Sequence, residues 1–193
     1  YGLGSFPYLV VTDSAGNVWS NDGETMAATS GSGHQWHTKV TSALSAGQSI
    51  TVGFPSLSRV AVQVLHFDDD IAAVDAGATG NNGGVASASP TTASFNTVAA
   101  SCLIVGTLAL VSSSRILTAG AGYTAASKIV TLAGSGNRAV QMEYKTVVAA
   151  GAYVADGTLD SGSIYAMVGR AYEIAGAPPA PGATASCRRS APS

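Results

Sequence analysis

The feature that most constrains this sequence is the regular interruption of its strand-like runs by turn-forming residues. Short runs rich in β-branched and aromatic residues alternate with Gly, Asn, Asp, Ser and Pro, and no segment sustains helical periodicity. Residues 13–17 (DSAGN) are typical of a turn, because Asp and Asn side chains hydrogen-bond to nearby backbone and Gly adopts positive φ. Residues 25–31 are expected to form at most one helical turn. The chain is therefore predicted to be all-β.

About eight or nine strands at this spacing predict a two-layer antiparallel β-sandwich of jelly-roll type. The clearest run is 59–67, in which Val60, Val62 and Val64 share one face. Residues 18–21 are expected to form a hairpin with 6–12. The strand-like runs cover residues 6–12, 18–21, 34–44, 49–54, 59–67, 102–112, 116–118, 128–132, 138–147, 154–159 and 163–174.

The length of 193 residues fits one domain with a tail. We assign residues 1–175 to the sandwich and residues 176–193, rich in Pro and Ala, to an extended tail. Residues 75–93 hold mostly Gly, Ala, Ser and Asn, so they are predicted to be a long loop, and loops of that length are usually functional or mobile.

Charge is scarce. Only 10% of the residues are charged, against about 25% in ordinary soluble proteins, and the net charge is −2. Nucleic-acid binding needs a clustered positive surface, so no nucleic-acid partner is predicted. No run reaches the roughly 18 apolar residues of a membrane span, so no membrane partner is predicted either. The composition is typical of an extracellular or virion-surface β protein.

The two cysteines and the neighbouring histidines do not predict a metal or other cofactor. Cys102 lies in an apolar run and Cys187 in the tail, and whether they pair stays open. His34 and His37 are three residues apart, so in a strand they point to opposite faces and cannot share an ion without a bulge.

Three carboxylates follow the clearest strand. Asp68, Asp69 and Asp70 could hold Ca²⁺, which prefers carboxylate and carbonyl oxygens. Their spacing is not that of an EF-hand loop, and charges at a strand end also discourage edge-to-edge pairing. The second interpretation is favoured, and the calcium site is kept as the alternative.

Three aromatic residues are candidates for stacking on a sugar ring: Trp36, Trp19 and Tyr123. For Trp36, which lies on a polar strand, packing in the core is the favoured interpretation, and stacking on a sugar is kept as the alternative.

Nothing in the sequence predicts catalysis. There is no Gly-x-Ser-x-Gly elbow, and the glycine-rich segment 119–122 lacks the Lys and Ser/Thr of a phosphate loop. Glu143 is the one carboxylate that its strand position suggests for a glycosidase pair, and no second member is indicated. We therefore predict a non-enzymatic protein with no catalytic residues.

Several segments, taken in order, resemble one group of proteins. Residues 13–19 (DSAGNVW), 44–52 (LSAGQSITV) and 60–64 (VAVQV), followed by 103–106 (LIVG), 121–123 (AGY) and 142–145 (MEYK), carry the resemblance. Over residues 5–175 the chain is similar to the β-sandwich modules of tailed-phage virion accessory proteins and related bacterial surface proteins. These modules act by packing and adhesion, so no catalytic or ligand residue is transferred.

The resemblance implies a capsid decoration, head-fibre or tail-surface protein located on the virion surface. Its expected partners are the major capsid protein or other virion proteins, and it is expected to form a homo-oligomer such as a trimer. Asn81 and Asn82 in the predicted loop, with Arg188 and Arg189 in the tail, are the candidate partner contacts. The alternative is a secreted or cell-surface carbohydrate-binding module whose partners are host-surface glycans.

Overall fold

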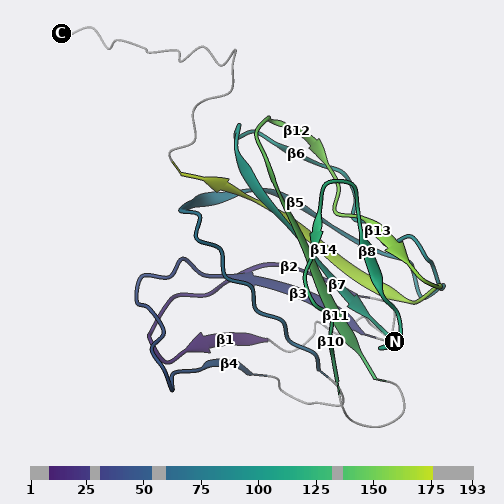
Figure 1. Ribbon diagram of the computed structural model, residues 1–193, viewed down its shortest axis with the longest axis horizontal. Coiled ribbons are helices and arrows are strands. Elements are labelled where there is room, and N and C mark those ends of the chain that lie inside the picture. The colour runs from purple at the N-terminus through teal and green to yellow at the C-terminus, as the bar shows by residue number, and fades with distance from the viewer. Residues whose placement is uncertain (1–8, 27–30, 54–59, 132–136, 176–193) are drawn as a thin grey trace, which may run out of the picture.

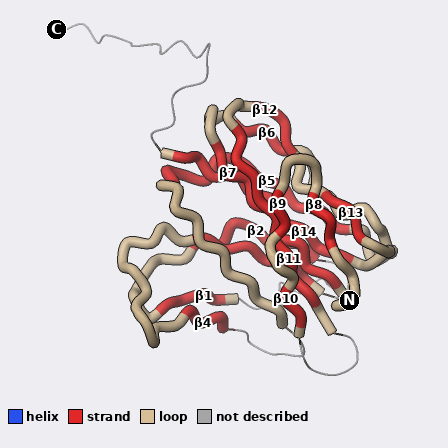
Figure 2. The backbone as a smooth tube through the Cα atoms, in the orientation of Figure 1, coloured by secondary structure: helices blue, strands red, loops and turns tan. Residues whose placement is uncertain are grey.

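The computed structural model describes residues 9–26, 31–53, 60–131 and 137–175. In this part of the chain there are strands and loops and no helix (Figure 2). The prediction of an all-β sandwich is confirmed. The strands are β1 (Val10–Asp13), β2 (Ser20–Met26), β3 (Ser32–His37), β4 (Ile50–Gly53), β5 (Ile71–Asn81), β6 (Phe95–Thr97), β7 (Cys102–Leu110), β8 (Leu117–Ala119), β9 (Thr124–Ala125), β10 (Ile129–Val130), β11 (Ala139–Val147), β12 (Gly151–Tyr153), β13 (Gly157–Leu159) and β14 (Tyr165–Ile174).

One large sheet organises the molecule. Its six strands run β10-β11-β7-β14-β5, with β9 also paired to β11, and its pairs are all antiparallel. The other described strands form four two-stranded ladders: β1–β4, β2–β3, β6–β12 and β8–β13. Figure 1 shows β6–β12 and β8–β13 to the upper right of the large sheet and β2–β3 on its other side, toward β1–β4. The covering layers are thus several short ladders rather than one second sheet, and the strands are shorter and more numerous than predicted.

The core follows the alternation of β7, the central strand predicted from its apolar run. Ile104 and Leu108 point to the side of β6–β12 and β8–β13, which we call face A, where they pack in clusters with Phe95 and Leu117. The odd-numbered residues of β7 point to the opposite side, face B, where Leu103 and Val105 pack with Tyr172. Both faces of the large sheet are therefore buried, as the run of apolar residues in β7 indicated.

The segment predicted as a long loop is largely a strand. Residues 71–81 form β5, at the edge of the large sheet next to β14, and only the part after it is a loop. Its small residues are required by close contacts: a Cβ on Gly80 would clash with the backbone of Thr91. The segment was predicted as a loop because it has few bulky residues, but small residues can also pack closely within a sheet.

The prediction of the clearest strand is also wrong, but here a segment predicted to be a strand is not one. Residues 60–67 have no ladder partner, although exposure alternates along them, with Val62 and Val64 exposed and their neighbours half-buried. The Gln63 side chain holds the segment to the sheet edge by donating to the Ser127 carbonyl and accepting from the Met142 amide. The alternation of exposed and half-buried residues reflects packing of one side of this segment against the protein and not pairing with another strand.

The N-terminal pairing also differs from the prediction. β1 pairs with β4, and β2 pairs with β3, so the expected hairpin between residues 6–12 and 18–21 does not form. The turn at 13–17 is present, but the strand after it, β2, does not pair with β1. The strand predicted over 34–44 ends at His37, and 38–49 is a loop. Residues 27–30 of the predicted turn, and the predicted tail 176–193, lie outside the described residues.

Candidate functional site

A lobe stands apart from the sandwich body. It consists of residues 10–19 and 38–53, which include β1 and β4, and Figure 1 shows it at the lower left. Val11 faces Val52 across the ladder, but the strands alternate only between half-buried and exposed. A two-stranded ladder of this kind is marginal by itself, so something else must hold it.

Hydrogen bonds around Asp13 and Asn17 hold the lobe. Asp13 accepts from the amides of Ala15 and Asn17 at 2.9 and 3.1 Å and from the Trp19 indole at 2.8 Å. Burial works to raise the pKa of Asp13, but the bonds from Trp19, Asn17 and Ala15 outweigh it and lower the pKa below its usual value. Trp19, predicted as a stacking residue, thus uses its one polar group internally.

The Asn17 side chain joins the two segments of the lobe. Its Oδ1 accepts from the amides of Thr41 and Ser42 at 2.9 and 3.0 Å, and its Nδ2 donates to the Ser42 carbonyl and to Asp13. Ser14 and Ser49 add two further bonds across the turn ends. The lobe is therefore built on a fixed network of hydrogen bonds and without an apolar core.

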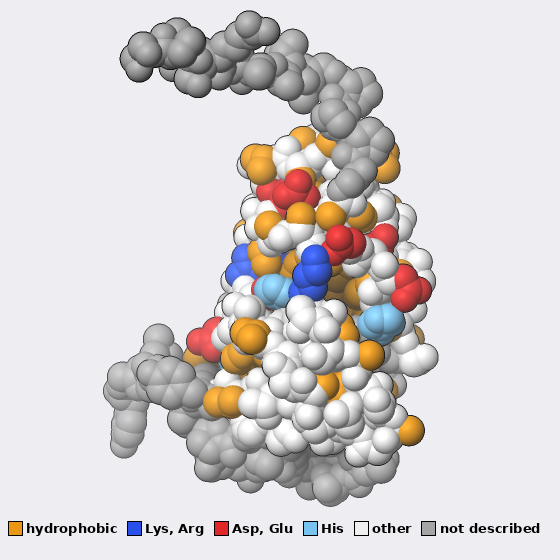
Figure 3. Space-filling view, turned by 90° about the vertical axis from the view of Figure 1, so that its left-hand side faces the viewer, with side chains coloured by type: hydrophobic (Ala, Val, Ile, Leu, Met, Phe, Trp, Pro, Cys, Tyr) orange, Lys and Arg blue, Asp and Glu red, His pale blue; other side chains and the backbone are white. Residues whose placement is uncertain are grey.

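The outer surface of the lobe is nearly uncharged. Asp13 and Lys39 are its only charged residues, while Val18 and Val10 are 81% and 51% exposed. Figure 3 shows that the lower part of this face carries white and orange side chains, whereas the charged and histidine side chains gather across its middle. Such a surface can be desolvated at small cost when another protein covers it.

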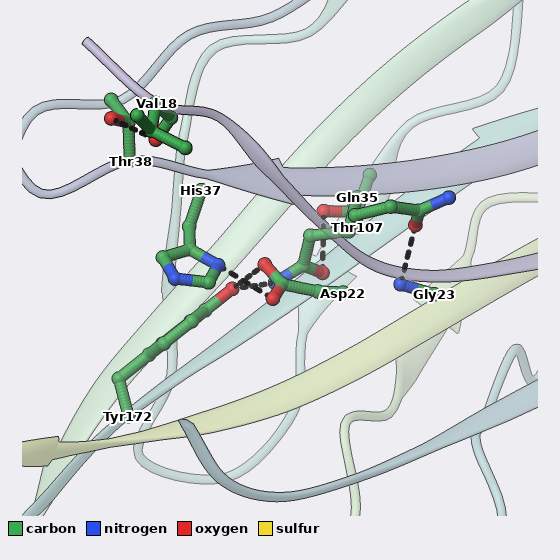
Figure 4. Close-up of polar contacts among 9 residues, drawn as sticks. Val18, Asp22, Gly23, Gln35, His37, Thr38, Thr107 and Tyr172 are labelled. Carbon is green, nitrogen blue, oxygen red and sulfur yellow. Dashed lines mark hydrogen bonds and ion pairs between the residues drawn. The ribbon is translucent and has the colours of Figure 1, made fainter. Parts of the chain in front are cut away.

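A buried polar chain crosses face B beside the lobe (Figure 4). The Thr107 hydroxyl donates to the side-chain oxygen Oε1 of Gln35 at 3.0 Å, and Nε2 of Gln35 donates to the Tyr172 hydroxyl at 2.9 Å. Tyr172 in turn donates to Asp22 Oδ2 at 2.5 Å, and His37 Nδ1 lies 2.6 Å from Asp22 Oδ1. Burial and the charge of Asp22 raise the pKa of Tyr172 well above its usual range. Tyr172 therefore remains a donor, and Asp22 acts as the acceptor at the end of the chain.

A β-bulge places Asp22. In the β2–β3 ladder Asn21 faces Trp36 and Gly23 faces Gln35, so Asp22 is the extra residue. Its side chain is 2% exposed, while that of His37 is 31% exposed. Bulges commonly turn a side chain in this way next to functional sites. Sequence reasoning missed Asp22, Gln35 and Tyr172, although Asn-Asp-Gly within a strand-like run was a usable signal for a bulge.

A second buried carboxylate lies on face A. Glu143 is fully buried and accepts from the amides of Gly120 and Asp156 at 3.2 and 3.1 Å. It lies over Gly106, where a Cβ would come within 3.0 Å of its side chain. Burial raises the pKa of Glu143 to about 7, against the opposing effect of these bonds. Glu143 thus fixes two loops, and its burial keeps it from reaching a large substrate.

Tyr123 and Lys145 lie beside this carboxylate. The Lys145 ammonium is 4.0 Å from the centre of the Tyr123 ring and 5.4 Å from that of Tyr153. The Tyr123 hydroxyl donates to the Val154 carbonyl at 2.6 Å. One face of the ring and the hydroxyl therefore already have partners in the free protein.

The remaining predicted residues are dispersed. Trp36 is half-buried, and its indole nitrogen is enclosed without a hydrogen-bond partner. Asn82 uses its side chain on Ser163 and the Tyr165 amide, and Asn81 bonds to Gly83 and Thr25. Arg188 and Arg189 lie outside the described residues.

The histidines and aspartates named as metal candidates do not converge. His34 pairs with Glu24 at 3.3 Å and His37 with Asp22 at 2.6 Å, and burial lowers the pKa of His34, an effect that Glu24 opposes. Asp68 and Asp69 are exposed, and Asp70 pairs with Lys39 at 2.5 Å. Among the described residues no group of three or more His, Cys, Asp or Glu side chains is arranged to hold a metal ion.

Cys102 is a buried free thiol. It donates to Asp75 at 3.3 Å, and burial first and then the charge of Asp75 raise its pKa to about 12.

In the part of the chain that the structure describes, no helix is long and apolar enough to cross a membrane. Comparison with protein-family models, curated proteins and solved structures finds no match to this chain.

Proposed function

We propose that the chain is a non-enzymatic structural module of a virion surface that works through protein contacts made by its lobe. The observation that carries the proposal is the construction of the lobe: an almost uncharged surface fixed in shape by the Asp13 and Asn17 hydrogen bonds. A surface that is ordered before binding loses less conformational entropy on association. The capsid decoration or head-surface role comes from the resemblance of the sequence, and the low charge of the chain agrees with it.

The polar clusters support a structural reading over a catalytic one. Asp22 and Glu143 are both buried, and their oxygens are engaged with groups of the chain itself. A carboxylate used in this way joins elements of the fold, and its burial shields it from a large substrate.

The first experiment is quantitative peptide mass spectrometry on density-purified virus particles from the source culture. Hundreds of copies per particle, relative to the major capsid protein, support decoration, and a few copies support a fibre or tail position. Absence from particles contradicts the proposal. A glycan-array screen of the purified protein would then test the carbohydrate-binding alternative.

The role of the lobe needs a matched pair of variants. Val18→Glu places a charge on the lobe and Val148→Glu places one elsewhere, at side chains that are 81% and 79% exposed. We expect Val18→Glu to reduce attachment to stripped particles, measured by co-sedimentation, by roughly tenfold or more, and Val148→Glu to attach normally. Equal attachment of the two variants would show that the lobe is not the contact surface.

A further inference from the structure

Residues 60–67 are a strand-like segment that the fold leaves unpaired. Their exposure alternates, because Val62 and Val64 are 44% and 55% exposed while Gln63 and Leu65 are half-buried. This period of two is that of a β-strand with one face against the protein. Figure 2 shows this part of the chain as a loop that runs in one direction toward the start of β5.

The backbone of this segment makes no hydrogen bond in the described part of the chain. None of the N–H and C=O groups of residues 60–67 has a partner there, in a strand, a loop or a side chain. Side chains hold the segment instead: Gln63 bonds to Ser127 and Met142, and the Phe67 ring packs edge-on against another ring. A row of unpaired backbone donors and acceptors is a template for another strand.

The two edges of the large sheet are less accessible than this segment. On the β5 side, the Ala93 amide donates to the Thr79 carbonyl at 3.1 Å, and Asp75 caps the loop after β6. On the β11 side, β9 and β10 pair with the outer edge of the strand. Residues 60–67 are therefore the more open place for a strand from another molecule.

The distribution of charge indicates which strand fits and in which direction. Residues 60–67 contain no Asp, Glu, Lys or Arg, so two copies of the segment can lie side by side without opposing such charges. Asp68, Asp69 and Asp70 follow at once. Parallel pairing of two copies would bring these carboxylates together, whereas antiparallel pairing places them at opposite ends of the ladder. An antiparallel pair of identical segments also has two-fold symmetry, so each bond made by one copy is repeated by the other.

We propose that residues 60–67 of two copies of this chain pair as antiparallel β-strands about a two-fold axis and form a dimer. The ladder gives partners to the unpaired backbone groups and brings the exposed valines of the two copies together as cross-strand neighbours. Such a ladder alone is smaller than the roughly 1,000 Å² of a stable interface, so the expected Kd is weak, roughly 10 µM to 1 mM. The surface differs from the lobe, and the dimer does not depend on the proposed virion role.

The first test is sedimentation equilibrium of the full chain from roughly 10 µM to 1 mM. A reductant is present, so that Cys187 cannot link two copies. The average molar mass should rise with concentration from that of one chain toward that of two, and it should not pass that limit, because a two-fold interface closes. A monomer over the whole range overturns the proposal, and so does growth to larger species.

Spin labels then test where the copies meet. Val64→Cys and Val148→Cys, each in a Cys187→Ser chain, carry one nitroxide at an exposed position, while Cys102 is buried and stays unlabelled. Dipolar broadening, which reports two labels close together, should appear at position 64 in the concentrated sample, vanish on dilution and be absent at position 148. A dimer that persists without broadening at position 64 contradicts the proposal, because another surface then joins the copies.

A pair of substitutions tests whether the backbone makes the contact. Val64→Pro removes an N–H that has no partner within the described chain, so the free energy of unfolding should hardly change. It should weaken dimerisation by roughly fiftyfold or more, since proline interrupts the ladder once in each copy. Val64→Ala keeps the N–H and should weaken dimerisation by at most roughly fivefold. Equal losses in the two variants would overturn strand pairing, and if Val64→Pro does not fold, the spin labels decide.

Discussion

The sandwich body and the lobe are stabilised by different forces. In the body, Ile104 and Leu108 are fully buried between strands, and each such side chain contributes roughly 1.5–3 kcal/mol by leaving water. In the lobe, Asn17 is the one described residue that is buried, and its amide makes bonds to both segments. In the body the stabilisation from apolar burial is spread over many residues, whereas the lobe depends on the side chains of Asp13 and Asn17. The lobe should therefore open locally at a lower free energy than the body unfolds.

The largest effect is expected from removing core volume in the body. Leu108→Ala should lower the free energy of unfolding by about 2–5 kcal/mol, because the cavity forms where Leu110, Leu117 and Met167 pack. Urea denaturation measures the loss. Val64→Ala is the control, since Val64 is 55% exposed and should change stability by less than about 0.5 kcal/mol. A similar loss in the two variants would mean that the core is misassigned.

The next effect concerns pH and Glu143. The pKa of this carboxyl is about 7 in the folded protein against 4.5 as the ordinary value, so the native state holds its proton more tightly than the unfolded state. Stability from this group is therefore complete below pH 4.5 and is lost as the pH rises to about 7, by an amount on the order of 3 kcal/mol.

Denaturation of Glu143→Gln over the same pH window isolates that contribution. The variant should lack the decline in the free energy of unfolding that the natural sequence shows. An identical slope in the two proteins would assign the pH dependence to other groups.

The lobe should respond locally to loss of its central amide. Asn17→Ala leaves the amides of Thr41 and Ser42, which are exposed, without their acceptor, and each hydrogen bond lost costs about 0.5–1.5 kcal/mol. Hydrogen exchange followed by mass spectrometry should speed up in residues 10–19 and 38–53 and stay unchanged in β7 and β14. Faster exchange throughout the chain would show that lobe and body form one cooperative unit.

The last prediction concerns the chemical reactivity of a thiol in the body and not the free energy of unfolding. Cys102 is fully buried, and its pKa rises from 9.0 to about 12, so at pH 8 its thiolate should be roughly a thousandfold scarcer than in the unfolded chain. Iodoacetamide labelling of the Cys102 peptide should accordingly be at least that much slower in the native protein than in urea. Comparable labelling rates in the two conditions would place the thiol at the surface.

Some of this structure could be predicted from the sequence because single residues carried the signal. The apolar run of β7, the alternation in β11 and the Asp13–Asn17 turn each report a local preference, and each lies where expected. Strand pairing was less accessible, because the register of β1 with β4 depends on Asn17 reaching residues 24 and 25 positions away. The polar network from Thr107 to His37 also could not be predicted, because it joins side chains up to 150 positions apart in the sequence.

β5 is a long edge strand of small residues, and its shape bears on how copies of the chain can associate. A flat edge of this kind could pair with the same edge of another molecule and extend without limit. Here the register shifts twice, and the residue displaced at the first shift is Asp75, whose carboxylate caps the amides of Val98 and Ala99. The interrupted edge discourages fibre growth. At high concentration the chain is thereby protected from polymerising edge to edge.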